Sequence, residues 1–263
     1  MTLAILQART SSSRLPGKVL APILGRPMIL HQLDRLKRAA TLDGIVVATS
    51  NDPSDDALAA VVTVAGVAVY RGSLGDVLGR FVGALDAHAP AASDVVRLTG
   101  DCPLIDPAIV DEVVRRHRET GADYTSNALV PSFPNGLETE VVKASVLRIA
   151  AAEADLASER EHVMPFIWKR PDRFRLAELR AQVDRSHLRW TVDTTADLTL
   201  VTAVFEALYP GNPHFDYGDV LALFARHPDL KGLNGGQIRN AGYARSLAED
   251  RTWTPAPSST PAG

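Results

Sequence analysis

The chain has 263 residues, of which 46% are hydrophobic, 22% charged and 6% aromatic, and its formal net charge is −3. These values exclude collagen-like, disulfide-scaffold and fully disordered chains, and the length is sufficient to bury a core without disulfides or a structural metal. The single cysteine, Cys102, cannot form an internal disulfide, and no CxxC motif is present, so we expect a reducing compartment, the cytoplasm. Because we find no signal-peptide core and no run of 18 apolar residues, we expect no association with a membrane.

Positive charge is concentrated near the start of the chain. Residues 1–42 contain seven cationic side chains and one acidic side chain, about +6, whereas the remainder is about −9. A local cationic patch in an acidic protein indicates a small anionic ligand. Binding to nucleic acid would more usually require a basic domain overall, so we expect no nucleic-acid partner.

The first half of the chain alternates short apolar runs with amphipathic segments. In chain order we predict a strand at 3–6, a helix at 27–40, a strand at 45–48, a helix opened by Asp52-Pro53 and ending near 65, a strand at 67–70, a helix at 74–88, a strand at 94–98, and a helix opened by Asp106-Pro107 and ending near 119. This alternation predicts an α/β fold with a largely parallel sheet covered on both faces. Ligands bind such folds at the carboxyl ends of the strands, so loops 7–18, 49–52, 71–76 and 99–106 are expected on one rim.

The second half of the chain lacks the regular alternation of strands and helices. We predict a turn at 131–136, a strand at 137–142, a helix at 144–157, a further helix opened by a capping box at 158–161, a strand at 188–192, and helices at 194–209 and 217–226. Thr194 and Asp197 fit a second capping box. Residues 252–263 form a tail rich in proline, serine and alanine, which we predict to be disordered. Residues 1–251 are expected to form a single domain.

The loop at 7–18, QARTSSSRLPGK, combines small residues with the three cations Arg9, Arg14 and Lys18. Exposed backbone N–H groups and fixed positive charge are what a polyphosphate needs. The loop does not fit the GxxxxGK[ST] pattern, because serine stands at position 12 and valine at position 19. From composition alone, a solvated basic loop is an equally good interpretation.

Two aspartates each follow a predicted strand. Asp101 comes after Gly100 in RLTGDCPL, and Asp193 lies between the predicted strand 188–192 and the next helix. Mg²⁺ typically takes one or two carboxylates together with phosphate oxygens, so the pair predicts a metal site. Taken alone, an aspartate that caps a turn is the simpler interpretation of Asp101.

Eight segments together match one known pattern: QARTSSSRLPGKVL (7–20), IVVATSND (45–52), YRGSLGDVLGRF (70–81), RLTGDCPLID (97–106), FPNGLETEV (133–141), SEREHVMPFI (158–167), LRWTVDTTADL (188–198) and NAGYARSLAED (240–250). On these residues the chain resembles the CMP-sugar synthetase-like cytidylyltransferases. This group includes the 3-deoxy-manno-octulosonate and acylneuraminate cytidylyltransferases, and the resemblance is greatest to the branch of spore-coat polysaccharide cytidylyltransferases. The resemblance spans residues 2–250.

The resemblance implies a Rossmann-like three-layer nucleotidyltransferase fold with a mostly parallel, mixed sheet. It also implies a homodimer, with an inserted segment near 130–185 that contributes to the dimer contact and to the sugar pocket. The implied reaction transfers CMP from CTP to a small acidic sugar, such as a sialic or ulosonic acid, with release of pyrophosphate and with Mg²⁺ as cofactor. The implied role is the synthesis of a surface polysaccharide or glycan.

The resemblance also implies roles for individual residues. Arg14, Lys18 and Asp101 are expected to be catalytic, with Asp101 and Asp193 as metal ligands. The residues expected to bind the nucleotide are Gln7, Ala8, Arg9, Thr10, Ser11, Arg14, Lys18, Thr49, Asn51, Arg71, Gly72, Ser73, Asp76, Thr99 and Gly100. Those expected to bind the sugar are Glu138, Glu140, Arg160, Glu161 and His162, with Arg160 pairing with the sugar carboxylate.

Two other functions stay open at this point. A glycosyltransferase that consumes nucleotide sugars can use a similar sheet, but such enzymes commonly carry a D-x-D metal motif, and this sequence has none. A nucleotide-sugar-binding subunit without catalysis is the second alternative. The joint presence of Lys18, Asp101 and Asp193 argues against it.

Overall fold

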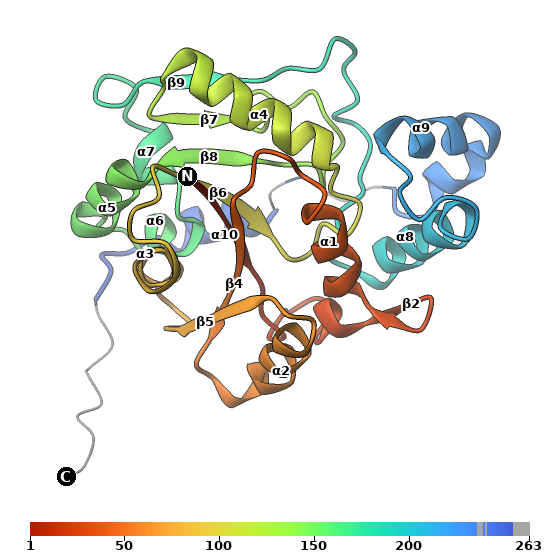
Figure 1. Cartoon of the computed structure of the whole chain (residues 1–263), viewed down its shortest axis with the longest axis horizontal. Coiled ribbons are helices and arrows are strands. Elements are labelled where there is room, and N and C mark those ends of the chain that lie inside the picture. The colour runs from red at the N-terminus through yellow and green to blue at the C-terminus, as the bar shows by residue number, and fades with distance from the viewer. Residues whose placement is uncertain (236–238, 240, 255–263) are drawn as a thin grey trace.

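The computed structural model describes residues 1–235, 239 and 241–254. Its main sheet has the strand order β5-β4-β1-β6-β8-β7-β9 (Figure 1). The strands are β1 (Thr2–Gln7), β4 (Gly44–Ser50), β5 (Ala68–Gly72), β6 (Asp94–Thr99), β7 (Tyr124–Ser126), β8 (Glu140–Lys143) and β9 (Leu176–Glu178). Only β8 runs against its two neighbours in this sheet, while the other pairs are parallel. The predicted mostly parallel, mixed sheet is therefore confirmed.

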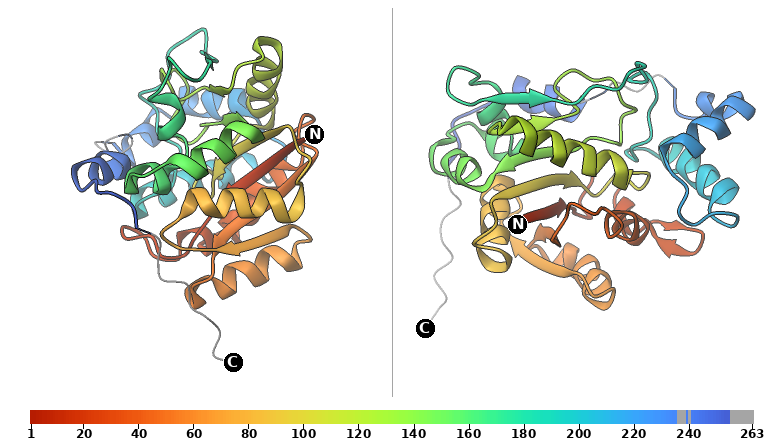
Figure 2. Two further views of the ribbon diagram at one scale, coloured as in Figure 1. Left: turned by 90° about the vertical axis from the view of Figure 1, so that its left-hand side faces the viewer. Right: turned by 45° about the horizontal axis from the view of Figure 1, so that its top comes forward.

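Helices cover both faces of the sheet. Successive side chains of each central strand point to opposite faces, so a strand with continuous apolar residues needs a helix layer on each side. Leu3 and Ile5 of β1 join the core shared with α3 (Val77–His88), α5 (Ala144–Glu153) and α7 (Pro165–Trp168). Ala4 and Leu6 join the opposite core, shared with α1 (Met28–Leu36), α2 (Asp56–Val64) and α4 (Pro107–Thr120). The views in Figure 2 show these layers from two further sides. The α/β fold with three layers is confirmed.

A third core lies beside the sheet (Figure 1). It is built around α8 (Thr195–Leu208), α9 (Tyr217–Arg226) and the buried Trp190, and it also receives Ile23 from the hairpin of β2 (Pro22–Ile23) and β3 (Arg26–Pro27). Two more helices, α6 (Ala157–His162) and α10 (Ala241–Ala248), pack against each other. Short 3₁₀ helices occupy Lys18–Leu20, Pro53–Asp55 and Pro228–Gly232. No helix in the described part of the chain is long and apolar enough to cross a membrane.

The predicted helix starts are confirmed where an acidic or hydroxyl side chain can cap the helix. Asp52 accepts from Ser54 N, and Asp106 accepts from the N–H groups of Ala108 and Ile109 at the start of α4. The capping box of Thr194 and Asp197 opens α8. These caps satisfy backbone donors that have no partner within their own helix.

One predicted helix cap and one predicted strand are wrong. The capping box at 158–161 does not form, because the Ser158 hydroxyl donates to Asp250 and Leu156 is the residue that precedes α6. Residues 188–192 form no strand of the sheet, since their only ladder contact is an isolated bridge between Arg189 and Asn135. Their apolar side chains are buried against α8 and α9, so the pattern indicated burial but not sheet pairing.

Other predictions need smaller corrections. The helix predicted at 27–40 is α1 and ends at Leu36, and the helix predicted at 144–157 is α5 and ends at Glu153. Sequence reasoning missed β7 and β9, which have three residues each. The segment 130–185, predicted as an insertion, contributes β8 and β9 to the main sheet. Its role in a dimer stays a prediction, as does the single domain.

The start of the predicted tail is ordered. Thr252 forms an antiparallel bridge with Leu156, Trp253 N donates to Asp155 O at 2.7 Å, and the Trp253 ring lies 4.3 Å from the guanidinium carbon of Arg160. Disorder is therefore wrong for Thr252 and Trp253. Thr254 is described and exposed, and residues 255–263 of the predicted tail lie outside the described residues.

Truncation distinguishes the two parts of the tail. A chain that ends at Arg251 is expected to lose the cation–π contact of Trp253, about 0.5–1 kcal/mol, together with its apolar packing. The midpoint of thermal unfolding, Tm, should therefore fall by about 2–4 °C. A chain that ends at Thr254 is the matched control and should keep the Tm of the full chain. Equal Tm values for the two truncated chains would contradict a stabilising role for Trp253.

Candidate active site

The carboxyl ends of the four parallel strands meet at one rim, as predicted. Gln7 at the end of β1 pairs with Thr99 of β6, and Ser50 of β4 pairs with Gly72 of β5. Gly100 follows β6 where a Cβ atom would lie 2.7 Å from the Cβ of Ala8, so only glycine fits this close approach. The loops after β1 and β6 therefore pack directly against each other.

The loop at 7–18 is held by a buried carboxylate. Asp55 accepts from Thr10 N at 2.7 Å and from Thr10 Oγ1 at 2.8 Å, and it also accepts from Ser50. Gly17 adopts φ of +72° and donates its N–H to Thr10 O, which closes the loop just before Lys18. The side chain of Thr10, predicted to bind the nucleotide, is thus engaged in shaping the loop.

Lys18 brings the two predicted metal ligands together. Its Nζ donates to Asp101 Oδ2 at 2.9 Å, to Asp193 Oδ1 at 2.8 Å and to Val192 O at 2.8 Å. The backbone adds a further link, because Val192 N donates to Asp101 O at 2.8 Å. Residues far apart in the sequence therefore converge on one ammonium group.

The charges in this cluster stabilise each other. Burial alone would raise the pKa of Asp101, but the charge and hydrogen bond of Lys18 lower it to about 2. Burial alone would lower the pKa of Lys18, but Asp101 and Asp193 raise it above its ordinary value. Lys18 and Asp101 are consequently both charged at neutral pH.

The depressed pKa of Asp101 predicts how pH affects stability. Its ionised form stabilises the fold at every pH above about 3.8, and this contribution is lost as the pH falls toward 2. The Tm difference between the wild type and Asp101→Asn should therefore be constant from pH 7 to pH 5, decline below about pH 4 and be largely lost by about pH 2. Thermal unfolding at each pH measures it. A difference that already declines between pH 7 and pH 5 would contradict this assignment.

Arginines form a second layer of charge around Asp193. Arg14 Nη2 lies 3.0 Å from Asp193 Oδ1, and Arg189 Nη2 donates to Asp193 Oδ2 at 2.8 Å. Arg189 also binds Asp197, the fully buried carboxylate of the capping box. Asp193 is therefore fixed by three cations, whereas Asp101 has one.

The donor set fits a divalent cation that is also bound by phosphate. Within the described ranges, no cluster of three or more acidic, histidine or cysteine side chains could hold a metal by itself. The carboxylates of Asp101 and Asp193 nevertheless converge on one point. This agrees with Mg²⁺, which usually combines one or two carboxylates with phosphate oxygens and water.

One of two cavities at the rim is strongly cationic. We call it the nucleotide-side cavity, because residues expected to bind a nucleotide line it, and its volume is about 280 Å³. Its charged lining residues are Arg9, Arg14, Lys18, Arg80, Asp101, Glu161, Asp193 and Arg245. Five cations against three acids give a lining suited to a polyphosphate.

The second cavity is larger and has a mixed lining. We call it the acceptor-side cavity, because residues expected to bind the sugar line it, and its volume is about 430 Å³. Its lining includes Arg97, Glu138, Glu140, Trp168, Arg189 and Tyr243. The residues common to both cavities are Arg14, Thr99, Asp101, His162, Asp193 and Gly242. The two spaces therefore meet at the pair of aspartates.

Only some of the residues predicted to bind the nucleotide line a cavity at the rim. Gln7, Ala8, Arg9, Arg14, Lys18, Thr99 and Gly100 line the nucleotide-side cavity. Thr10, Ser11, Thr49, Asn51, Arg71, Gly72, Ser73 and Asp76 are described but line neither cavity. Arg71 instead donates to the carbonyls of Ser50 and Asp52, and Asp76 caps α3 at Gly79 N.

Most, but not all, of the residues predicted to bind the sugar line one of the two cavities. Glu138, Glu140 and His162 line the acceptor-side cavity, and Glu161 lines the nucleotide-side cavity. Arg160 lines neither, because it is buried, donates twice to Asp76 and lies under the Trp253 ring. The expectation that Arg160 pairs with a sugar carboxylate is wrong for this arrangement of the chain.

Acidic groups of the acceptor-side cavity are held by cations. Glu140 pairs with Arg97 and accepts from Tyr124 OH at 2.5 Å. Glu138 pairs with Arg239 at 2.5 Å and accepts from Gly136 N. Burial raises the pKa of Glu138 despite the charge of Arg239.

Sequence reasoning missed several residues of the site. Arg80 on α3 is almost fully buried, has no carboxylate within ion-pair distance among the described residues, and has an unpartnered Nε. From α10, Tyr243 stacks edge-on against His162, and Ser246 Oγ donates to Glu161 Oε2 at 2.8 Å. The segment NAGYARSLAED at 240–250 was the available signal for α10.

Comparisons with known proteins identify the family of the chain. A family model described as Cytidylyltransferase matches residues 3–208, more than half of the chain. The spore coat polysaccharide biosynthesis protein SpsF of Bacillus subtilis is 34% identical over 237 residues, which cover 86% of this chain and 95% of that protein. A 3-deoxy-manno-octulosonate cytidylyltransferase of Anaeromyxobacter is 39% identical over 142 residues, 53% of this chain and 55% of that enzyme.

A solved structure shows the same likeness over almost the whole fold. A cytidylyltransferase from Leptospira borgpetersenii superposes with a TM-score of 0.83 at 28% identity, covering 91% of this chain and 99% of its own. The region matched by the family model, residues 3–208, includes the loop at 7–18, both aspartates and the whole of α8. The chain therefore belongs to the cytidylyltransferase family and is a nucleotidyltransferase.

Proposed function

We propose that the protein transfers CMP from CTP to a hydroxyl group of a small sugar acid and releases pyrophosphate. The observation that carries the proposal is the meeting of a cationic cavity and a mixed cavity at Asp101 and Asp193. A nucleotide in the first cavity and a sugar in the second would bring the hydroxyl to the α-phosphorus at this point. The family description and the cytidylyltransferases among the relatives support CTP as the nucleotide.

In the proposed reaction, the sugar oxygen forms a bond to the α-phosphorus as the bond to the bridging oxygen breaks. Pyrophosphate leaves with that electron pair, and the hydroxyl proton passes to water. Arg9, Arg14 and Lys18 are assigned to hold the phosphates and to stabilise the charge that develops on the leaving group, and their position in the lining of the nucleotide-side cavity supports this role. Holding both reactants in adjoining cavities supplies the remainder of the catalysis, by positioning.

Asp101 and Asp193 would hold Mg²⁺, which when bound neutralises phosphate charge and lowers the pKa of a coordinated hydroxyl. The contact of both carboxylates with Lys18 Nζ supports this assignment. Lys18 lowers the pKa of Asp101 and, by hydrogen bonds to both carboxylates, orients Asp101 and Asp193 before the substrate binds.

The sugar carboxylate is proposed to bind the guanidinium groups of the acceptor-side cavity rather than Arg160. Arg97 and Arg189 line that cavity and each already binds a carboxylate of the chain. Arginine binds carboxylates through two parallel hydrogen bonds, so these side chains can accommodate a second carboxylate by sharing donors.

We further propose a cytoplasmic homodimer that takes part in the synthesis of a surface polysaccharide or glycan. The name of the Bacillus relative supports the polysaccharide role. Val130 and Val183 are 43% and 56% exposed within the segment predicted to form the dimer contact. Sedimentation equilibrium tests the dimer, and a monomeric mass at micromolar concentration would overturn it.

The nucleotide is tested first by thermal stability with CTP, GTP, UTP, ATP and dTTP, each with and without Mg²⁺. A nucleotide at about 100 times its Kd adds about 2.7 kcal/mol of stability. A rise in Tm selective for CTP with Mg²⁺ is expected, followed by pyrophosphate release when sugar acids are added. Stabilisation by nucleotide sugars but by no free nucleotide would favour a glycosyltransferase or a binding subunit instead.

Arg80 is expected to contribute directly to nucleotide affinity. Its buried guanidinium lines the nucleotide-side cavity, and burial, with Arg9 nearby, lowers its pKa to about 10, so a bound phosphate would relieve unfavourable charge. Arg80→Gln should raise the Kd for CTP at least about tenfold, consistent with about 1.5–3 kcal/mol for a hydrogen bond to a charged group.

Calorimetric titration of CTP measures this effect. Arg148→Gln is a matched control, because Arg148 pairs with Asp86 on the surface and lines neither cavity. An unchanged Kd in Arg80→Gln would remove Arg80 from the nucleotide site.

A further inference from the structure

The last described segment of the chain crosses the active site. We call residues 239 and 241–254 the C-terminal strap. At the start of the strap, Arg239 pairs with Glu138 at 2.5 Å. Near its end, Asp250 accepts from Ser158 N at 3.0 Å and from Ser158 Oγ at 2.6 Å. The helix α10, which lies between these contacts, is therefore tied to the rest of the protein on both sides.

Between the two anchors, α10 is held by few contacts. None of its residues is buried. It lies beside α6 (Figure 1), where Ser246 Oγ donates to Glu161 Oε2 at 2.8 Å and lies 2.9 Å from His162 Nε2. Tyr243 packs edge-on against His162, with the ring centroids 4.9 Å apart. An isolated helix of eight residues is unstable in water, so α10 depends on such contacts for its position.

α10 forms part of the wall of both active-site cavities. Gly242, Arg245 and Ser246 line the nucleotide-side cavity, and their spacing of three and four residues places them on one face of the helix. Ala241, Gly242 and Tyr243 line the acceptor-side cavity. A change in the position of this helix therefore alters both cavities.

Arg245 is the residue of α10 that suits an anionic ligand. Its side chain is exposed in the wall of the cationic cavity, and among the described residues it has neither an ion pair nor a side-chain hydrogen bond. Arg14 and Lys18 of the same wall are already bound to Asp193, and Glu161 accepts from α10 itself. The Arg245 guanidinium is therefore available for a phosphate group, which arginine binds through two parallel hydrogen bonds.

We propose that Arg245 binds the phosphate groups of the nucleotide and that nucleotide binding thereby fixes α10 against the active site. This inference rests on the proposed function for the identity of the ligand. Tyr243, on the same helix, is then held in the wall of the acceptor-side cavity. The family model matches residues 3–208, so Arg245 adds to the cations of the loop at 7–18 from outside that part of the chain.

Titration calorimetry with pyrophosphate and with CTP, both in the presence of Mg²⁺, tests the role of Arg245. Arg245→Gln should raise the Kd for each ligand about tenfold, the effect of losing a hydrogen bond to a charged group. Arg245→Lys should give a smaller increase, because lysine keeps the charge but not the planar pair of donors.

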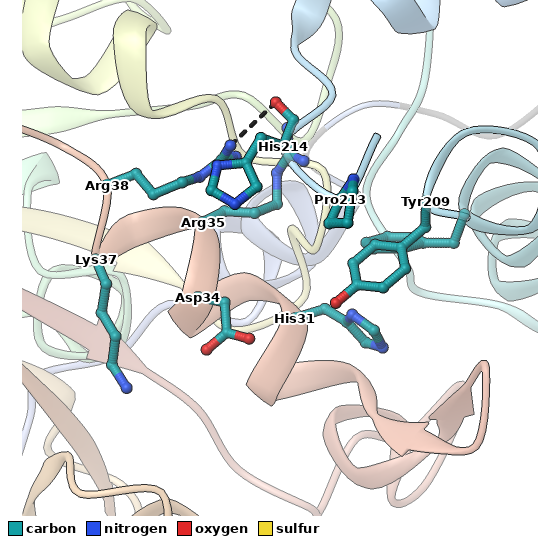
Figure 3. A pocket seen from close by; sticks show the side chains of 9 residues that line it. His31, Asp34, Arg35, Lys37, Arg38, Tyr209, Pro213 and His214 are labelled. Carbon is teal, nitrogen blue, oxygen red and sulfur yellow. Dashed lines mark hydrogen bonds between the residues drawn. The ribbon is translucent and has the colours of Figure 1, made fainter. Parts of the chain in front are cut away.

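Two control variants separate this role from general effects of charge and of helix stability. Arg38→Gln removes an arginine from a third cavity, between α1 and the segment that leads to α9, where Arg38 Nη1 donates to His214 O at 3.0 Å (Figure 3). None of the residues that line this third cavity lines either cavity of the active site. Leu247→Ala changes α10 itself at an exposed position that lines neither active-site cavity. Both controls should keep each Kd within about twofold.

Hydrogen exchange measures the fixation of α10. If the docked helix strengthens ligand binding about tenfold, linkage requires that saturating ligand raise the ratio of docked to undocked helix by the same factor. With pyrophosphate, the amides of residues 241–248 should therefore exchange about tenfold more slowly in the wild type, and their exchange should not slow in Arg245→Gln. The amides of α9, which lines neither active-site cavity, should show no change in either protein.

Three outcomes overturn the inference. They are an unchanged Kd for pyrophosphate in Arg245→Gln, a control variant that weakens binding as much as Arg245→Gln, and exchange of α10 that pyrophosphate does not slow in the wild type. A wild type that binds pyrophosphate but not CTP would overturn the proposed nucleotide and leave the assignment of Arg245 in force. Binding of neither ligand would overturn both.

Discussion

Replacing Asp101 by asparagine is expected to lower kcat for CMP transfer by about a thousandfold, the scale of losing one preorganised charged group in an active site. The carboxylate lies where the two cavities meet and binds Lys18 Nζ at 2.9 Å. Asparagine preserves the shape but removes the negative charge that a divalent cation requires. Pyrophosphate release at saturating CTP and Mg²⁺ measures the effect.

Folding should survive this change, because Lys18 keeps its bonds to Asp193 and Val192. Asp123→Asn is the matched control, since Asp123 also binds a lysine at 2.9 Å but lines neither cavity. The control should keep kcat within about twofold. Activity of Asp101→Asn within tenfold of the wild type would show that this carboxylate holds no metal needed for the reaction.

The sheet could be predicted from the sequence because its signals are local. Apolar runs separated by capped helices specify β1, β4, β5 and β6, and parallel pairing then places their carboxyl ends on one rim. The position of the loop after β1 and of Asp101 at that rim could therefore be predicted as well. Short strands such as β7 and β9, with three residues each, carry too little pattern to be recognised.

The rest of the site depends on contacts between distant segments. Asp193 follows a segment that forms no strand of the sheet. The hydrogen bond from Val192 N to Asp101 O holds this segment in place and so brings Asp193 next to Lys18. Arg160 was expected at the sugar, but Asp76 and Trp253, both far away in the sequence, hold it elsewhere. Single residues such as these carry no periodic signal, so only the folded chain shows their partners.

Arg80 was missed for a related reason. It lies on α3 beside Val77 and Phe81, both buried, so its position belongs to the apolar side of the helix. A cation at such a position is a signal of a buried partner or ligand, because a buried charge without compensation is costly. The pattern of hydrophobic residues alone gives no indication of which partner it has.

Replacing Lys18 by methionine is expected to lower both the turnover and the stability of the protein, and a divalent cation should restore only the stability. Turnover should fall by at least about a thousandfold, because the phosphates lose a fixed cation. Without a divalent cation, the protein should also lose about 3 kcal/mol of stability, since removing one partner of a buried pair leaves uncompensated charge. The Lys18 side chain is only 9% exposed, so solvent screens this loss weakly. Tm should fall by about 6–10 °C.

Addition of Mg²⁺ should then restore much of the lost stability, because Asp101 and Asp193 face one space without the ammonium group between them. Tm with 5 mM Mg²⁺ and with EDTA measures this, and the gain should be larger in Lys18→Met than in the wild type. Lys143→Met is the control, since it removes a lysine from the more exposed pair with Asp123 and should show no greater gain than the wild type. If the gain of Lys18→Met is no larger, the two aspartates do not form a divalent-cation site, and the convergence on Lys18 serves only to position the lysine for the phosphates.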